Sequence, residues 1–200
     1  MKKILYLHGF GSSGASGTVE LLRKEFWNKD AAHRATVTAP DIPVDPAAAM
    51  PMLEALAYDE MPDLIVGTSM GGMYAQMLRG FTRICVNPSL TITKKYNVLY
   101  VGKHKWLNRR KDGETEFHVT KETIAHFQEM EAHQFDDITD DDRLLCHGLF
   151  GDEDEMMPEV RPIFEQYYPG MAHVFPGGHR MNAEVVTRTL LPYIRSLNIF

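Results

Sequence analysis

The sequence predicts an α/β protein with a central parallel sheet, and two observations carry that prediction. Short apolar runs typical of buried strands alternate along the chain with longer segments of helical periodicity. Several of these runs end in glycine-rich or polar loops, which is where functional groups gather in parallel sheets. Alternating strands and helices imply right-handed crossovers with helices on both faces. We therefore expect about six parallel strands between two helical layers.

The predicted strands and helices follow one another in a regular order. Each strand is a short run of apolar or β-branched residues, and the alternation is broken at one place. Pro40 ends the second strand, and Asp45 caps the next helix with Pro46 in its first turn. Strands are expected at residues 4–7, 35–39, 63–67, 82–86, 143–150 and 171–175, and helices at 18–29, 46–60, 72–79, 160–168 and 182–196.

The break in the alternation is residues 89–142, between the fourth and fifth predicted strands. The first part, residues 94–111, contains seven lysines and arginines, and the last part, residues 129–142, is strongly acidic. Between them, Thr120 begins a sequence typical of a capped helix. We interpret residues 89–142 as a lid-like insertion in a single domain that spans residues 1–200. The basic part is either a solvated surface or a region that attracts an anionic substrate.

Length and composition limit the classes of function. The 200 residues, of which 44% are hydrophobic, are enough for one domain with a substantial core. A formal net charge of -6 argues against a general nucleic-acid-binding protein. Small molecules are therefore the expected partners.

The cysteines, the histidines and the amino-terminal residues bear on cofactors and location. Cys85 and Cys146 are the only cysteines, and their spacing matches neither a disulfide framework nor a zinc site. The four histidines in the insertion likewise lack the spacing of a metal site. The first apolar run stops at His8 and is too short for a signal peptide or a membrane span. We therefore expect a cytoplasmic protein without a metal, a cofactor or a membrane span.

The most informative motif surrounds Ser69, just after the third predicted strand. The sequence Gly67-Thr-Ser-Met-Gly71 matches the G-x-S-x-G turn, in which a strand turns sharply into a helix. Its glycines have no Cβ, so the backbone can adopt strained dihedral angles and expose the serine hydroxyl. An apolar strand before the motif and helical spacing after it satisfy the context that the motif requires. Ser69 is therefore predicted to be a nucleophile.

A serine nucleophile needs a base, a carboxylate that orients the base, and donors for the oxyanion. The base candidate is His179, in a Gly-Gly-His sequence directly after the sixth strand. The carboxylate candidates are the four acidic residues 152–155, after the fifth strand. The backbone N–H groups of Phe10 and Met70 are the expected oxyanion donors. The chain order serine, aspartate, histidine is that of the α/β-hydrolase fold.

These motifs resemble those of a known family. The segments His8-Gly-Phe-Gly-Ser-Ser13, Gly67-Thr-Ser-Met-Gly-Gly72, Val86-Asn-Pro88 and Gly177-Gly-His179 are similar to those of the small YqiA-type esterases of the α/β-hydrolase superfamily. The resemblance covers nearly the whole chain. It implies a minimal α/β-hydrolase fold and hydrolysis of ester or thioester bonds without a cofactor. The family pattern places the acid three residues after a glycine, which is Asp154, with Asp152 as the alternative.

The main functional hypothesis is a serine hydrolase that cleaves ester or thioester bonds of small acyl substrates. Ser69 would form an acyl-enzyme, His179 would relay the proton, and Asp154 would hold the imidazole in the correct tautomer. Two alternatives stay open, because a fold does not determine a function. One is a non-catalytic protein that binds a small molecule, and the other is a hydrolase of peptide or carbon–carbon bonds.

Overall fold

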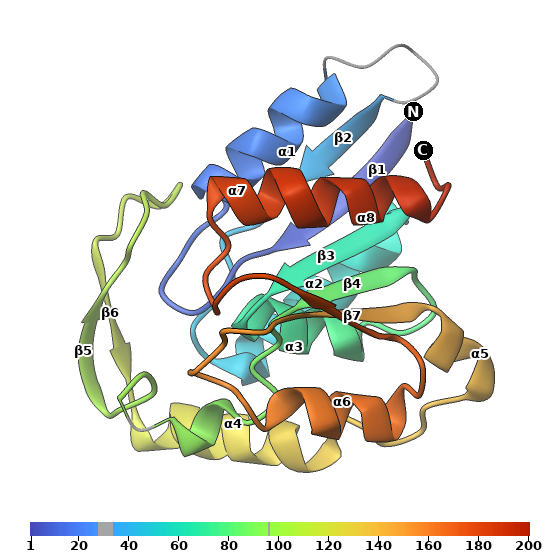
Figure 1. Cartoon of the computed structure of the whole chain (residues 1–200). Coiled ribbons are helices and arrows are strands. Elements are labelled where there is room, and N and C mark those ends of the chain that lie inside the picture. Colours follow the sequence, from blue (N-terminus) through green and yellow to red (C-terminus); the bar gives the residue numbers. More distant parts are fainter. Residues whose placement is uncertain (28–33, 96) are drawn as a thin grey trace.

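The computed structural model describes residues 1–27, 34–95 and 97–200, with a parallel sheet at its centre (Figure 1). Within these residues the central sheet has six strands, all parallel, in the order β2-β1-β3-β4-β7-β8. The strands are β1 (Lys2–Leu7), β2 (Ala35–Thr38), β3 (Leu64–Thr68), β4 (Arg83–Val86), β7 (Cys146–Gly151) and β8 (Ala172–Phe175). The predicted α/β fold class and its parallel sheet are confirmed.

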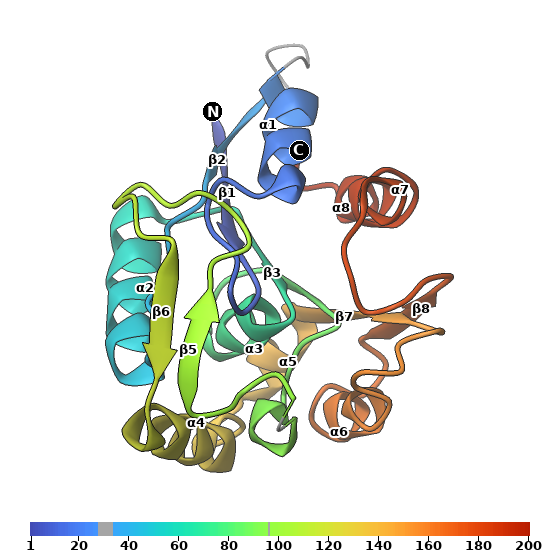
Figure 2. The same cartoon turned by 90° about the vertical axis from the view of Figure 1, so that its left-hand side faces the viewer.

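Helices cover both faces of the sheet (Figure 2). One face is covered by α1 (Gly17–Trp27), α7 (Ala183–Val185) and α8 (Leu191–Ser196), with a π-helical turn (Val186–Leu190) between the last two. The opposite face is covered by α2 (Pro46–Glu60), α3 (Met70–Met77), α4 (Lys121–His133) and α6 (Val160–Tyr167). The helix predicted at residues 18–29 is α1, and its predicted end at residue 29 lies outside the described residues.

The strands are apolar on both faces because both faces are buried. In β1, Ile4 and Tyr6 pack into the core with α1 and α8, whereas Leu5 and Leu7 pack into the core with α2 and α3. All four side chains are at most 2% exposed. This burial explains the continuous apolar runs from which the parallel sheet was predicted.

The fifth strand of the central sheet begins at Cys146, and its predicted start at residue 143 is wrong. A short helix, α5 (Asp140–Leu144), occupies the residues before it. Thr139 caps this helix, because its side chain accepts the backbone N–H of Asp142 at 3.1 Å. Acidic residues in the first turn suit the positive end of the helix dipole, so this helix had a signal in the sequence.

The segment between β4 and β7 contains an antiparallel hairpin that the sequence analysis did not predict. Its strands are β5 (Gly102–Lys105) and β6 (Glu116–Val119). Figure 1 shows the hairpin at the left, on the side to which the arrowheads of β1 and β3 point. Helix α4 follows it, starts after the predicted cap Thr120 and extends to His133.

The far end of this segment is tied to the sheet by a buried ion pair. Arg83 in β4 is fully buried, and its guanidinium lies 2.8 Å from the carboxylate of Asp142. The same guanidinium donates to the backbone carbonyls of Gln76 and Asp142 at 2.8 and 3.0 Å. Removing one partner would leave the other charge buried and unpaired, which typically costs about 3–5 kcal/mol.

Both cysteines are free thiols, and they are fully buried on the neighbouring strands β4 and β7. Their sulfur atoms lie 3.8 Å apart, and burial raises the pKa of the Cys85 thiol well above its usual value.

Among the described residues, no helix combines the length and the apolar character needed to cross a membrane.

Candidate active site

Ser69 lies at the turn between β3 and α3, with backbone angles that residues other than glycine rarely adopt. Its φ is 55° and its ψ is -120°. Such a conformation costs of order 1–3 kcal/mol and persists only where the surrounding structure enforces it. Gly71 is part of that constraint, because a Cβ there would lie 2.1 Å from the carbonyl oxygen of Leu7. The N–H of Ser69 also donates to the carbonyl of Val86 on the neighbouring strand at 3.0 Å.

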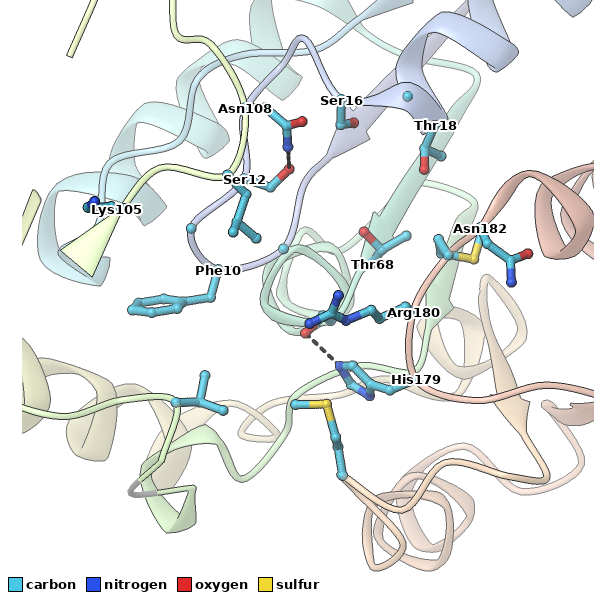
Figure 3. A pocket seen from close by; sticks show the side chains of 18 of the residues that line it. Phe10, Ser12, Ser16, Thr18, Thr68, Lys105, Asn108, His179, Arg180 and Asn182 are labelled. Atoms are coloured by element: carbon cyan, nitrogen blue, oxygen red, sulfur yellow. Dashed lines mark hydrogen bonds between the residues drawn. The ribbon is translucent and has the colours of Figure 1, made fainter. Parts of the chain in front are cut away.

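Three polar side chains meet at the carboxyl ends of β3, β7 and β8. The Oγ of Ser69 lies 2.9 Å from Nε2 of His179 (Figure 3). On the other side of the ring, Nδ1 of His179 lies 2.8 Å from Oδ2 of Asp154. The side chains of His179 and Asp154 are only 9% and 8% exposed. The fold therefore brings together three residues that are far apart in the sequence.

The hydrogen bonds around His179 determine the position of its proton. An ionised carboxylate only accepts hydrogen bonds, so Nδ1 carries the proton and donates to Asp154. Nε2 of the neutral ring then accepts the hydrogen bond from the hydroxyl of Ser69. Burial raises the pKa of Asp154, but hydrogen bonds from His179, Met157 and Met156 outweigh it and hold the pKa below its ordinary value. Asp154 is therefore ionised at neutral pH.

Asp152, the alternative acid, makes a different contact. Its Oδ1 accepts the backbone N–H of Gly177 at 2.9 Å, in the loop that carries His179. Asp152 thus joins the loop after β7 to the loop after β8. Asp154, in contrast, contacts the imidazole ring itself.

Asn87 joins the same two loops, and the sequence analysis assigned it no role of its own. It follows β4 in a left-handed conformation, with a φ of 42°. Its side-chain nitrogen donates to the carbonyls of Gly178 and His179 at 3.0 and 3.1 Å, and its side-chain oxygen accepts the N–H of Gly151 at 2.8 Å. Its place directly after a parallel strand is the signal that would have found it.

Ser89 is the second polar residue at this site that the sequence analysis missed. Its Oγ lies 2.9 Å from the Oγ of Ser69, and its backbone N–H donates to the carbonyl of Ser69 at 2.9 Å. The residue is 1% exposed. The hydroxyl of Ser69 therefore has two polar neighbours, His179 and Ser89.

The backbone N–H groups of Phe10 and Met70 lie close to Ser69. Met70 is the first residue of α3, where N–H groups have no partner within the helix. Phe10 follows Gly9, at which a Cβ would lie 3.2 Å from the Cβ of Ser69, so this loop passes next to the serine. In the described part of the chain, neither N–H donates to a backbone carbonyl.

His8 holds the loop that contains Phe10. Its Nε2 accepts the backbone N–H of Ile42 at 3.0 Å, so the proton of the neutral ring is on Nδ1, which donates to the carbonyl of Gly9 at 2.8 Å. Burial, reinforced by the nearby Arg110, lowers the pKa of His8 to about 4. His8 is therefore neutral at pH 7 and acts on the loop through backbone hydrogen bonds.

Ser69 and His179 line a cavity of about 800 Å³. One side of the cavity is formed by the insertion together with the loop after β1, and the other side by the end of β3, residues 16–21 and the residues after His179 (Figure 3). The volume is within the usual range for small-molecule sites. The first side contributes a group of apolar side chains, called the apolar wall below, which are Phe10, Val98, Tyr100, Leu107 and Phe117. Polar side chains lie on the same side, among them Ser12, Lys105 and Asn108, and on the other side, among them Ser16, Thr18, Thr68, Arg180 and Asn182.

The hairpin is attached to the loop that carries Phe10. The rings of Phe10 and Phe117 pack edge to face, with centroids 5.4 Å apart. The backbone N–H of Leu107 donates to the carbonyl of Gly11 at 2.7 Å. The insertion therefore forms part of the cavity that Ser69 opens onto.

Ion pairs neutralise part of the basic segment, residues 94–111. Lys95 pairs with Glu159 at 3.2 Å, and Lys103 pairs with Glu116. Lys105 is the lysine of this segment that lines the cavity, among the residues that the structure describes. The charge of the segment is therefore only partly directed at the site.

Residues 3–183 match the model of an uncharacterised protein family, UPF0227. The chain belongs to this family. The match spans most of the chain and confirms the predicted resemblance to YqiA-type proteins of the α/β-hydrolase superfamily.

Solved α/β-hydrolase structures resemble this UPF0227 chain over nearly its whole length. The match with Est1E from Butyrivibrio proteoclasticus has a TM-score of 0.65 at 16% identity, and it covers 99% of this chain and 88% of the Est1E chain. The match with mouse alpha/beta hydrolase domain-containing protein 10 has a TM-score of 0.62 at 15% identity, and it covers 98% of this chain and 88% of the mouse chain. The match with FphF, a fluorophosphonate-binding serine hydrolase of Staphylococcus aureus, has a TM-score of 0.58 at 13% identity. It covers 100% of this chain and 84% of the FphF chain. These likenesses confirm the α/β-hydrolase fold.

Proposed function

We propose that this UPF0227 protein is a serine hydrolase that cleaves carboxylic ester or thioester bonds of small acyl substrates. The observation that carries the proposal is the continuous chain of hydrogen bonds from Ser69 through His179 to Asp154, with contacts of 2.9 and 2.8 Å. The strained backbone of Ser69, the lowered pKa of Asp154 and the cavity at the serine support it.

In the proposed mechanism, the Oγ of Ser69 attacks the acyl carbon while Nε2 of His179 takes the hydroxyl proton. The N–H groups of Phe10 and Met70 stabilise the oxyanion, and the loss of one such donor typically lowers turnover about 10²–10³-fold. His179 then gives the proton to the leaving group. A water molecule, activated by the same imidazole, releases the acyl group, and Asp154 holds the ring in its tautomer throughout.

The two alternative functions receive less support from the geometry. A small-molecule-binding protein needs the cavity but has no need of a serine that is strained and hydrogen-bonded to a histidine and an aspartate. A hydrolase of peptide or carbon–carbon bonds would use the same three residues, and the apolar wall of the cavity favours an acyl group instead.

We further propose that residues 1–200 form one domain in which residues 89–142 act as a lid-like insertion over the site. The contacts between the hairpin and the loop after β1 support this arrangement. The buried free thiols of Cys85 and Cys146 are compatible with the cytoplasm, where we propose that the enzyme acts.

The test of the proposed function is hydrolysis of 4-nitrophenyl esters of short and long carboxylic acids by the purified protein. Ser69→Ala should lower kcat at least about 10⁴-fold, because the nucleophile is lost. Ser196→Ala, which removes a hydroxyl that contacts only a helix carbonyl on α8, is the matched control and should keep the wild-type rate. A fluorophosphonate probe should label the wild type and the control, but not Ser69→Ala. An undiminished rate in Ser69→Ala would contradict the proposal.

A further inference from the structure

The hydrogen bond between Ser69 and Ser89 has a definite direction. Nδ1 of His179 donates to the carboxylate, so its Nε2 receives the one hydroxyl proton of Ser69. The Oγ of Ser69 therefore has no proton left for Ser89, and the 2.9 Å contact between the two Oγ atoms requires Ser89 to donate. Because Ser89 is 1% exposed, solvent does not compete for its proton.

We propose that Ser89 is a second catalytic hydroxyl, which donates a hydrogen bond to the reacting Oγ of Ser69; this role rests on the proposed serine hydrolase function. The backbone N–H of Ser89 donates to the carbonyl of Ser69 at 2.9 Å, so the backbone holds the two residues together independently of the contact between their hydroxyls. A hydrogen bond to an oxygen that gains negative charge becomes shorter and stronger. Ser89 therefore stabilises the states in which charge collects on Oγ.

The step that depends most on Ser89 is deacylation. Water attacks the acyl carbon and gives a proton to His179, the bond between the acyl carbon and Oγ breaks, and the electron pair stays on Oγ. His179 then returns the proton to Oγ, while Ser89 keeps its own proton and stabilises the departing oxygen. In acylation the same hydrogen bond withdraws charge from the attacking oxygen. The two steps therefore respond differently to its loss.

Ser89→Ala tests this role, because it removes the hydroxyl and keeps the backbone hydrogen bond. With 4-nitrophenyl butyrate, we expect kcat to fall about tenfold and KM to fall with it, so that kcat/KM changes by less than about twofold. Stopped-flow measurements should show a burst of nitrophenolate equal to the enzyme concentration, because the acyl-enzyme accumulates. The rate of fluorophosphonate labelling, which reports only the attack by Ser69, should stay near that of the wild type.

Thr91→Val is the matched control for Ser89→Ala. It removes another buried hydroxyl from the same segment, one that donates to Glu159 at 2.9 Å, and it should keep the wild-type kcat and KM. An unchanged kcat in Ser89→Ala, or an equal loss in Thr91→Val, overturns the role of Ser89 and leaves the proposed function standing. A parallel fall of kcat, kcat/KM and labelling, with a lowered Tm, marks a structural role and overturns it too. A wild-type protein without activity or labelling overturns both proposals.

An independent observation concerns Arg180, the residue after His179. Its side chain is exposed and extends into the cavity that Ser69 lines (Figure 3). In the part of the chain that the structure describes, no residue forms an ion pair or a hydrogen bond with it. Among the described residues that line the cavity, the other charged side chains, apart from the histidines, are those of Lys105 and Glu20.

We infer that Arg180 binds an anionic group, a carboxylate or a phosphate, on the leaving-group part of the substrate of the proposed hydrolase. In that reaction His179 gives its proton to the leaving group, and Arg180 lines the same cavity as His179. The guanidinium presents paired N–H donors that match the oxygens of a carboxylate or phosphate. Lys105 adds to the attraction, and Glu20 keeps an anion away from the start of α1.

The test compares 4-nitrophenyl butyrate with 5-butyryloxy-2-nitrobenzoate, whose leaving group carries a carboxylate. Arg180→Gln should lower the ratio of kcat/KM for the charged ester to that for the neutral ester about tenfold. Arg188→Gln is the matched control, because Arg188 pairs with Glu184 at 3.2 Å and lies outside the residues that line the cavity. Its ratio should stay within about twofold of the wild type.

Three outcomes overturn the role of Arg180 in an active enzyme. One is an unchanged ratio in Arg180→Gln, and another is an equal change in both variants, which reports net charge alone. The third is a fall of kcat/KM in Arg180→Gln that is confined to mono-4-nitrophenyl glutarate, whose carboxylate lies on the acyl part. That result would show that Arg180 binds an anion on the acyl part of the substrate and not on the leaving group. An inactive wild-type protein overturns the proposed function together with this inference.

Discussion

Two regions of the molecule are built in different ways. One is the end of the sheet that carries Ser69, called the sheet end below, and the other is the insertion, residues 89–142. Around Ser69 the backbone packs so closely that a Cβ at Gly67 or Gly71 would lie 2.1 Å from a carbonyl oxygen. The hairpin is instead attached through the backbone hydrogen bond from Leu107 to Gly11 and through side chains, such as Phe117, which packs on Phe10. Loops placed on a rigid scaffold suit binding, whereas reacting atoms need fixed geometry. For the proposed hydrolase, this difference assigns reaction and selectivity to separate regions, and four predictions test that separation.

The largest effect is expected from Gly71→Ala, which attacks the rigid region directly. The new Cβ would lie 2.1 Å from the carbonyl oxygen of Leu7, a backbone atom that cannot move without displacing β1. We expect the free energy of unfolding to fall by more than about 4 kcal/mol, with loss of ester hydrolysis. Chemical denaturation measures the change. Gly17→Ala, where a Cβ meets nothing within 4 Å, is the control, and equal stability of the two variants would contradict the prediction.

The next effect is that of Asp154→Asn, which keeps the fold of the rigid region and changes its chemistry. The asparagine oxygen can still accept the N–H groups of Met156 and Met157, but the amide no longer holds His179 in the required tautomer. We expect kcat to fall about 10³–10⁴-fold. Asp152→Asn, which keeps an acceptor for Gly177, should lower kcat by less than about tenfold. The opposite ranking of the two variants would show that the carboxylate is Asp152.

His8 lies where the two regions meet, since Arg110 of the insertion is near it. Burial lowers the pKa of His8 to about 4, so between pH 6.5 and 4 the unfolded chain binds a proton that the folded chain does not. The free energy of unfolding should therefore decrease as the pH is lowered from 6.5 to 4, by about 3 kcal/mol from His8 alone. Urea denaturation across this pH range measures the slope.

The control for this pH dependence is His8→Gln, which cannot titrate and should show a shallower slope. Burial also lowers the pKa of His147 to about 4, and its contribution is common to both proteins, so their difference isolates His8. Equal slopes in the wild type and His8→Gln would rule out this role for His8.

The smallest effect is expected from Tyr100→Ala, which removes part of the apolar wall in the insertion. Tyr100 is 47% exposed and lines the cavity, so its loss should change binding more than stability. We expect KM for 4-nitrophenyl octanoate to rise about fivefold to tenfold, with kcat and the KM for the acetate unchanged. Tyr58→Ala, at an exposed tyrosine on α2 outside the cavity, is the control. A fall of kcat for both esters would show that the insertion takes part in the reaction.

The sheet end was predictable because local sequence determines it. A strand, a turn with glycines at 67 and 71, and a helix must occur together, and the parallel sheet brings the loops after its strands to one edge. The choice between Asp152 and Asp154 was harder, since four acidic residues follow one another. Only the structure shows that Asp152 contacts Gly177 while Asp154 contacts His179.

The hairpin was not predictable, because no local sequence pattern determines it. Its strands, Gly102–Lys105 and Glu116–Val119, are short and carry several charged or polar residues, so they lack the apolar runs that identified the other strands. Its contacts are with the loop near Phe10, which is far away in the sequence. Ser89 escaped notice because an isolated serine carries no pattern, and its position beside Ser69 depends on the pairing of β3 with β4.

The way in which residues 89–142 join the sheet has a consequence for changes in the length of this segment. Strands β4 and β7 pair directly and in parallel, from Arg83 with Cys146 onward, so the segment between them leaves at the carboxyl end of β4 and re-enters at the opposite edge of the sheet, where β7 begins. In the part of this segment that the structure describes, the strands β5 and β6 pair with each other and not with the central sheet. Each doubling of the length of a flexible connection adds only about 0.6 kcal/mol of closure cost. A longer or shorter turn between β5 and β6 would therefore leave the pairing of β4 with β7, and the turn that carries Ser69, in place.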